Sequence, residues 1–148
     1  MVSILSLTTL VVLSSVALHA AEWPQFRGPG GQGHSSERDL PLKWTEDENV
    51  VWKVPIPGLG WSSPVIQGDK IWLTSALGKG QSLRAVCLLR EDGRILHEVE
   101  IFQQNNPGPI HSKNSHASPT PILEDDRVYV HFGAFDLFCR RRLGSHSR

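Results

Sequence analysis

One segment of this chain occurs twice, 57 residues apart, and this repeat limits the possible folds more than any other feature. The first copy covers residues 63–73 (SPVIQGDKIWL) and the second covers residues 120–130 (TPILEDDRVYV). Each copy has the pattern of two short strands around a polar turn, with a β-branched residue before an aromatic residue in the second strand. Every position keeps its chemical character except Gly68, which becomes Asp125. The chain therefore uses one supersecondary unit more than once, and such units bury their faces against neighbouring copies.

Four strands are expected in the stretch that begins with the first copy. They are predicted at residues 62–66, 70–75, 82–89 and 94–102, and Gly93 supplies the positive φ that the last tight turn needs. The 41 residues of this stretch fall within the roughly 40–45 residues of a four-stranded propeller blade. A meander of four antiparallel strands cannot bury both of its faces alone. We therefore predict an all-β fold, a β-propeller of four-stranded antiparallel blades.

Only part of a propeller is expected from this chain, because a propeller needs at least about four blades. Residues 62–102 would supply one full blade, and residues 120–139 would begin a second blade that lacks a turn and closing strand like those around Gly93. Residues 50–54 (VVWKV) align with the last strand of the full blade at a spacing of 45 residues, so we expect an orphan outer strand there. The chain is therefore interpreted as a truncated or frame-shifted fragment, which needs missing blades or self-association to close the ring.

The start of the chain has the pattern of a secretory signal peptide, which we place at residues 1–21. Residues 2–18 hold no charge, are rich in Leu, Val, Ser and Thr, and are followed by a small-residue segment, so cleavage is expected after Ala20 or Ala21. We therefore predict an exported bacterial protein, periplasmic or extracellular, with no membrane span after cleavage. An uncleaved N-terminal anchor is the alternative.

Composition separates three further parts of the chain. Residues 22–48 are rich in Gly, Pro, Ser and charge, which predicts a flexible lead segment. Residues 49–139 form the partial propeller region, and residues 140–148 (RRRLGSHSR) form a basic tail that a frame shift would explain. The whole chain has 15 basic and 15 acidic side chains, but four of the arginines lie in its last nine positions. The body is therefore mildly acidic, which argues against a nucleic-acid-binding surface.

Residues around the predicted Gly93 turn are similar to a known repeat. Residues 87–97 (CLLREDGRILH) resemble Ala-Leu-Asp-x-x-Thr-Gly-Lys-x-x-Trp, the repeat of the bacterial pyrroloquinoline-quinone-like (PQQ-like) β-propeller proteins of the quinoprotein alcohol dehydrogenase-like superfamily. Residues 23–29 (WPQFRGP), and residues 51–53 (VWK) followed by 61–64 (WSSP), also resemble segments of exported members. The resemblance covers about residues 23–139 and implies the propeller fold. Four residues depart from the repeat: Cys87, Leu89, Asp92 and His97.

The resemblance implies one of two kinds of function. In the quinoprotein alcohol dehydrogenases, PQQ lies at the centre of the propeller near a calcium ion and a pair of adjacent cysteines. In the non-catalytic kind, which includes the outer-membrane assembly propeller, the surface binds proteins. Because this chain has no adjacent cysteine pair, we expect a binding or scaffold role, with a protein or small-molecule ligand on the propeller loops. The alternative is the N-terminal portion of a PQQ-dependent alcohol or sugar dehydrogenase. No cofactor is expected in this chain, and PQQ and calcium would belong only to a full-length enzymatic parent.

An insertion is expected between Glu100 and Ala117, because the two spacings, 57 and 45 residues, differ by 12. It lacks apolar periodicity and contains two prolines, so it should form an exposed loop, where binding groups often lie. Its candidate ligand-binding residues are His111, Asn114 and His116, whose imidazole and amide groups could also ligate a metal. No acidic residue in the insertion completes a metal site, so surface hydrogen bonding is the alternative interpretation. The sequence has no hydrolase, metalloprotease or nucleotide-binding motif, so we predict no catalytic residue and no metal site.

Three other residue sets are interpreted as structural. Cys87 and Cys139 take corresponding positions in successive blades, which lie roughly 10 Å apart, so we expect buried thiols and no disulfide. The glycine-rich residues 28–33 follow no strand and open no helix, so they are assigned to the lead segment rather than to a phosphate-binding loop. The tryptophans expected to pack between sheets, rather than to stack on a cofactor, are Trp52, Trp61 and Trp72.

Overall fold

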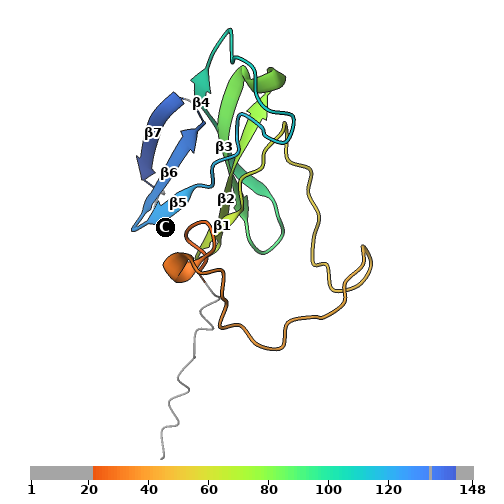
Figure 1. The fold of residues 1–148 in the computed structure, drawn as a ribbon. Helices are drawn as coiled ribbons and strands as arrows, with labels where there is room; N and C mark the ends of the chain where they lie inside the picture. Colours follow the sequence, from red (N-terminus) through yellow and green to blue (C-terminus); the bar gives the residue numbers. More distant parts are fainter. Residues whose placement is uncertain (1–21, 134, 143–148) are drawn as a thin grey trace, which may run out of the picture.

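Strands make up most of the regular structure, and they form two antiparallel sheets (Figure 1). The structure, a computed structural model, describes residues 22–133 and 135–142. In chain order the strands are β1 (Val65–Gln67), β2 (Lys70–Leu77), β3 (Ser82–Leu89), β4 (Ile95–Gln103), β5 (Ile122–Glu124), β6 (Arg127–Phe132) and β7 (Phe135–Arg142). The first sheet has the order β1-β2-β3-β4 and the second has the order β5-β6-β7. Two short 3-10 segments, η1 (Pro29–Gly31) and η2 (Gly78–Gly80), complete the list of elements in the described part of the chain. The predicted all-β class is confirmed, and the described residues form no closed propeller.

The first sheet lies close to its predicted position. β3 has the predicted bounds, β2 ends two residues later than predicted, and β4 is shifted by one residue. β1 begins three residues later than predicted, at Val65. Pro64 has no amide hydrogen for a strand ladder, and the Ser62 hydroxyl accepts the hydrogen bond from the Thr74 amide at 3.0 Å. The Ser62 side chain therefore takes the place of the backbone acceptor that β1 would offer to Thr74 if the strand began earlier.

The turn inside each copy of the repeat has the same backbone conformation. Gly68, between β1 and β2, has a φ of 58°, and its equivalent Asp125, between β5 and β6, has a φ of 50°. This left-handed region is open to glycine, and aspartate is among the few other residues that are enriched there. The one chemical exception in the repeat therefore preserves the turn.

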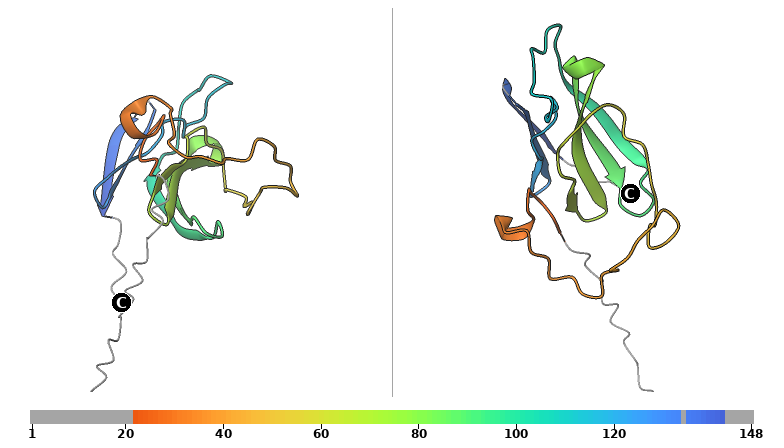
Figure 2. Two further views of the ribbon diagram at one scale, coloured as in Figure 1. Left: turned by 90° about the horizontal axis from the view of Figure 1, so that it is seen from below. Right: turned by 45° about the vertical axis from the view of Figure 1, so that its right-hand side comes forward.

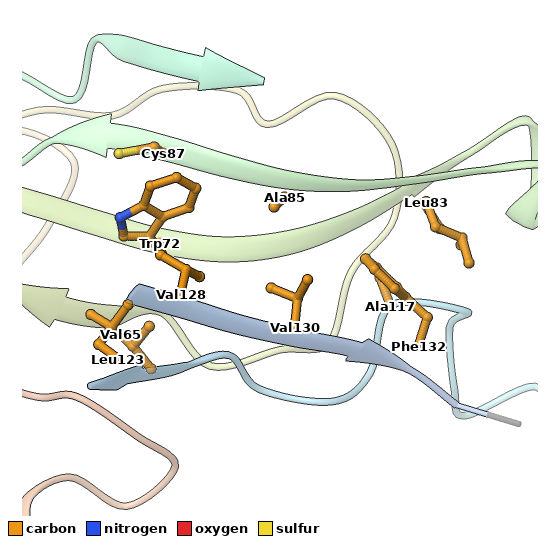
Figure 3. Packing of buried hydrophobic residues seen from close by; sticks show 11 residues of the cluster. Val65, Trp72, Leu83, Ala85, Cys87, Ala117, Leu123, Val128, Val130 and Phe132 are labelled. Atoms are coloured by element: carbon orange, nitrogen blue, oxygen red, sulfur yellow. The ribbon is translucent and has the colours of Figure 1, made fainter. Parts of the chain in front are cut away.

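The two sheets pack face to face and enclose the hydrophobic core (Figure 2). Both sheets supply apolar side chains to it, and each large side chain buried there contributes about 1.5–3 kcal/mol to folding. The main members are Val65, Trp72, Ala85 and Cys87 from the first sheet and Leu123, Val128, Val130 and Phe132 from the second (Figure 3). β1 and β5, the first strands of the two sheets, contact each other at one edge of the pair. Trp72 packs between the sheets as predicted.

The sheets meet through opposite faces of the repeated unit. Val65 of the first sheet points into the core and is 0% exposed, but its equivalent Ile122 lies on the outer side of the second sheet and is 48% exposed. Val128 of the second sheet points into the core. Its equivalent in the first sheet, Ile71, directly precedes the core residue Trp72 in β2, so Ile71 lies on the face opposite the core. We call the face with Val65 or Ile122 the front face and the face with Ile71 or Val128 the back face. The front face of the first sheet therefore packs on the back face of the second.

The segment from Trp52 to Leu59 lies along the back face of the first sheet. At one end, Trp52 Nε1 donates a hydrogen bond of 2.9 Å to the Arg90 carbonyl. The Trp52 indole packs on Gly93, where a Cβ atom would lie 2.5 Å from the ring. At the other end, Leu59 and Ala76 form an isolated antiparallel bridge. The segment therefore extends from the β3–β4 turn to the end of β2.

The orphan outer strand predicted at residues 50–54 is not formed. The segment has the expected alternation, since Trp52 and Val54 are half-buried while Val51 is exposed. A strand also needs a neighbour to share its backbone hydrogen bonds, and no described strand pairs with these residues. The segment instead covers the side of β3 on which Val86 is 0% exposed.

The lead segment begins with residues that are held by both sheets. Trp23 and Ile66 exchange two backbone hydrogen bonds of 2.9 Å, which extends the free edge of β1. The Pro24 carbonyl accepts a hydrogen bond of 2.8 Å from the Leu123 amide of β5. The first residues of the predicted lead segment 22–48 are therefore paired with the sheets, because an unpaired strand edge recruits them.

The second sheet extends further than its predicted boundary. β7 pairs with β6 and runs to Arg142, three residues into the predicted basic tail. Cys139 lies opposite Val130 in this ladder, whereas Cys87 lies opposite Trp72, which is the equivalent of Tyr129. The predicted correspondence of the two cysteines is therefore wrong by one residue, because the connection before β7 is shorter than the one before β3. The predicted signal peptide and residues 143–148 lie outside the described residues.

Candidate functional site

The inserted loop between β4 and β5 is attached at both ends to the first sheet. At its start, the Gln104 amide donates a hydrogen bond of 2.8 Å to the Gln81 carbonyl, and Gln104 Nε2 donates one of 3.0 Å to the Gly80 carbonyl. At its end, the Ala117 carbonyl accepts hydrogen bonds from the Trp61 and Ser62 amides at 3.0 and 3.2 Å. The loop is therefore held on a rigid support, as binding loops commonly are.

A buried polar junction holds the end of the loop beside the first sheet. The Thr74 side chain is 1% exposed, and its hydroxyl lies 3.3 Å from both the Ala117 and the Pro119 carbonyl oxygens. The Ser63 amide donates a hydrogen bond of 3.0 Å to the Thr120 hydroxyl. Ser63 and Thr120 are equivalent positions of the repeat, so this bond joins the first copy directly to the second.

The last turn of the loop is fixed by two serines. The Ser118 hydroxyl accepts from the Ser115 amide at 3.0 Å and donates to the Ser115 carbonyl at 2.9 Å. The Ser115 hydroxyl accepts from the Ala117 amide at 3.1 Å. Both hydroxyls are therefore used by the backbone, and they hold the two residues between them, His116 and Ala117, in a defined turn.

Two adjacent pockets lie against this loop. The larger has a volume of about 500 Å³ and the smaller a volume of about 250 Å³. The larger lies between the loop, the segment before β1 and the η2 turn, and the smaller is bounded mainly by prolines of the loop, Leu83 and Phe132. Both pockets are lined by Ile110, Asn114, Ser115 and His116. The candidate site is therefore built where the inserted loop lies against the first sheet, and its smaller pocket also reaches Phe132 at the end of β6.

The three predicted ligand-binding residues all lie at this site. Asn114 and His116 line both pockets, whereas His111 lines only the smaller one. His111 is exposed, and its Nδ1 accepts a hydrogen bond of 3.2 Å from the Lys113 amide. Within the described residues, no group of three or more His, Cys, Asp or Glu side chains could hold a metal ion. The arrangement suits the hydrogen bonding of an organic ligand.

The sequence did not predict most residues of the larger pocket. Among these are Trp61, Lys79 and Gly80. Trp61 is 65% exposed in the pocket wall, so the prediction that it packs between sheets is wrong. Gly80 has a φ of 99°, and a Cβ atom there would lie 2.1 Å from His116 Cδ2. The two glycines at residues 78 and 80 indicate a tight turn, but nothing in the sequence indicates that this turn contacts His116.

The charge of the larger pocket comes from Lys79, because neither Asp nor Glu is among its lining residues. Lys79 is an exposed side chain in the η2 turn. The pocket therefore favours a neutral or an anionic ligand over a cation. A calcium ion prefers several carboxylate oxygens, so the donor set of this pocket does not fit one.

Comparisons of the chain with protein-family models, with curated proteins and with solved structures gave no match. Across residues 22–133 and 135–142, no helix has the length and apolar character needed to cross a membrane.

Proposed function

We propose that this chain is part of an exported β-propeller repeat protein that binds a ligand beside the loop that joins successive repeats and carries out no chemistry on it. The proposal is supported by the way the sheets meet, front face on back face. Such a heterologous interface generates a ring if the rotation between units closes. A propeller of about four or more blades is a ring of this kind. The repeat resemblance in residues 87–97 points to the same architecture.

The binding role is carried by one observation, the pocket of about 500 Å³ between the inserted loop, the segment before β1 and the η2 turn. Pockets for small ligands range from about 300 to 1,000 Å³ and combine apolar walls with a few convergent polar groups. The pocket is lined by Ser115, whose hydroxyl is used by the backbone, and the buried thiol of Cys87 is not among the lining residues. The site thus offers recognition groups, and neither Ser115 nor Cys87 supplies an activated nucleophile to it.

The alternative function, the N-terminal portion of a PQQ-dependent dehydrogenase, is favoured only by Trp61. An exposed indole in a pocket wall could stack on a flat quinone ring. The absence of acidic side chains from the lining opposes a neighbouring calcium site. The two functions are separated by adding PQQ and calcium to the longer parent protein, in which bound quinone is detected by its absorbance. A binding protein gives no alcohol- or sugar-dependent dye reduction, whereas such a reduction would overturn the non-catalytic proposal.

The proposed pocket is tested by ligand-observed NMR with a panel of sugars, carboxylic acids, amino acids and nucleosides. We expect at least one class to bind the wild type and to lose binding in Gly80→Leu, because the new side chain collides with the His116 ring. Gly30→Leu is the matched control, since Gly30 also has a positive φ but has nothing within 4 Å of the added Cβ. Circular dichroism is used to check that both variants fold like the wild type. Equal binding by both variants would place the ligand elsewhere and contradict the proposal.

A further inference from the structure

The larger pocket offers an unusual aromatic surface. Trp61 is 65% exposed, although tryptophan is usually a well-buried residue. Its backbone is fixed by the hydrogen bond of 3.0 Å from its amide to the Ala117 carbonyl. The indole therefore forms a flat apolar wall on a stable support, ready to pack on a ring-shaped ligand.

The polar groups of the pocket can both donate and accept hydrogen bonds. They are the Ser112 hydroxyl, the Asn114 amide and the His116 imidazole. The His116 ring lies directly on the backbone of Gly80, which limits the orientations open to it. Hydroxyl groups of a ligand are also both donors and acceptors, so this set matches a polyhydroxylated molecule.

Lys79 adds a positive charge that no carboxylate of the lining neutralises. An ammonium group binds a carboxylate through a charge-assisted hydrogen bond. A ligand with a negative charge would therefore gain an interaction that its neutral counterpart lacks. The chemistry of the lining then specifies three ligand features: one apolar ring face, several hydroxyl groups and one anionic group.

We infer that the larger pocket binds an anionic saccharide, a pyranose ring that carries a carboxylate. The C–H face of the ring packs on Trp61, the ring hydroxyls bind Asn114 and His116, and the carboxylate binds Lys79. The volume of about 500 Å³ accommodates one or two such rings. This inference rests on the proposed binding function and names the ligand class of the same site.

The test compares glucuronic acid with glucose, which lacks the carboxylate, and with benzoic acid, which lacks the hydroxyls. Binding to the full chain is measured by ligand-observed NMR at low salt. We expect glucuronate to bind about tenfold more tightly than glucose, the difference that one charge-assisted hydrogen bond supplies. Glucose binding as tightly as glucuronate, or benzoate binding more tightly, would overturn the inference.

Two variants, each with a matched control, locate the ligand in the pocket. Lys79→Gln should lower glucuronate affinity to that of glucose and leave glucose binding unchanged, whereas Lys43→Gln changes an exposed lysine outside the pocket lining and should have no effect. Trp61→Ala should weaken both sugars, whereas Trp44→Ala, at a residue with 68% exposure, should weaken neither. An unchanged glucuronate affinity in Lys79→Gln would overturn the inference.

Failure of this inference is distinguishable from failure of the proposed function. If another class of the panel binds and is lost in Gly80→Leu while glucuronate does not bind, the saccharide inference is wrong and the binding function stands. If no class binds in a Gly80-dependent manner, both are wrong.

Discussion

Cys87 shows how its surroundings set the chemistry of a single side chain. It lies opposite Trp72 on one neighbouring strand and His97 on the other, and it is 0% exposed. Burial raises the pKa of its thiol from 9.0 to about 12, and this desolvation outweighs the attraction of Lys70. The predicted buried thiol is confirmed for Cys87, whereas the side chain of Cys139 lies outside the described residues. A protonated, buried thiol is a poor nucleophile, so Cys87 serves packing.

This pKa predicts how stability depends on pH. The Cys87 thiol ionises near pH 9 in the unfolded chain but only near pH 12 in the folded one, so rising pH in this window favours unfolding. The stability advantage of the wild type over Cys87→Ala should therefore shrink between pH 9 and 11, by at most about 1.4 kcal/mol per pH unit. Urea unfolding of both proteins at several pH values measures this difference in the free energy of unfolding. Cys139 is present in both proteins. A constant difference would show that the thiol remains solvated.

At the scale of elements, the two sheets are joined by the hydrogen bond between Ser63 and Thr120 as well as by apolar packing. The Ser63 amide is partly buried, and the Thr120 hydroxyl is its acceptor at 3.0 Å. A buried amide that loses its partner costs about 1–3 kcal/mol. The bond therefore stabilises the packing of the two sheets and also fixes the position of β5 beside β1.

Replacing that hydroxyl by a methyl group tests the junction. We expect Thr120→Val to lower the free energy of unfolding by about 1–3 kcal/mol. Thr45→Val is the matched control, since the Thr45 hydroxyl accepts from the Asp47 amide at 3.3 Å in an exposed turn, and should cost less than about 0.5 kcal/mol. Chemical denaturation of both variants gives the comparison. Similar losses in the two variants would show that the junction bond has no special role.

The strands that the sequence predicted well are those bounded by clear turns and paired within the chain. β3 lies between the η2 turn and the turn that contains Gly93, and its bounds were predicted correctly. The strand predicted at residues 50–54 has a suitable pattern but no partner in the described chain. Pattern alone cannot supply a neighbour, because strand formation depends on pairing across long sequence distances.

The candidate site was predicted in part for a similar reason. His111, Asn114 and His116 were found because they cluster in one insertion. Trp61 and Lys79 come from separate connections and meet the insertion only in the folded chain. Their positions depend on how the insertion folds back onto the first sheet, which neither periodicity nor composition encodes.

At the scale of the whole molecule, the front face of the second sheet presents an exposed apolar side chain. Ile122 is 48% exposed there, whereas its equivalent Val65 is fully buried beneath the second sheet. The apolar position at which the first sheet packs on the second is therefore repeated, exposed, on the front face of the second sheet. Exposed apolar faces of this kind favour association with a further unit.

We expect the isolated chain to self-associate as its concentration rises. Ile122→Lys should shift the equilibrium towards the monomer, because a buried lysine would lose its hydration. Leu42→Lys adds the same charge at a residue that is 93% exposed outside the sheets, and it should leave the association unchanged. Sedimentation velocity over a range of concentrations measures the effect. A monomer at all concentrations, or equal shifts in both variants, would contradict this expectation.

The bond between Ser63 and Thr120 also gives the molecule a direction. The first copy contributes a backbone donor and the second contributes a side-chain acceptor, so exchanging the two copies would not restore the same contact. An array built from such bonds has a fixed direction, with a backbone donor left over at one end and a side-chain acceptor left over at the other. Further copies of the unit can therefore be added in one order only. A duplicated gene segment would encode that order, because each copy would carry both the donor and the acceptor.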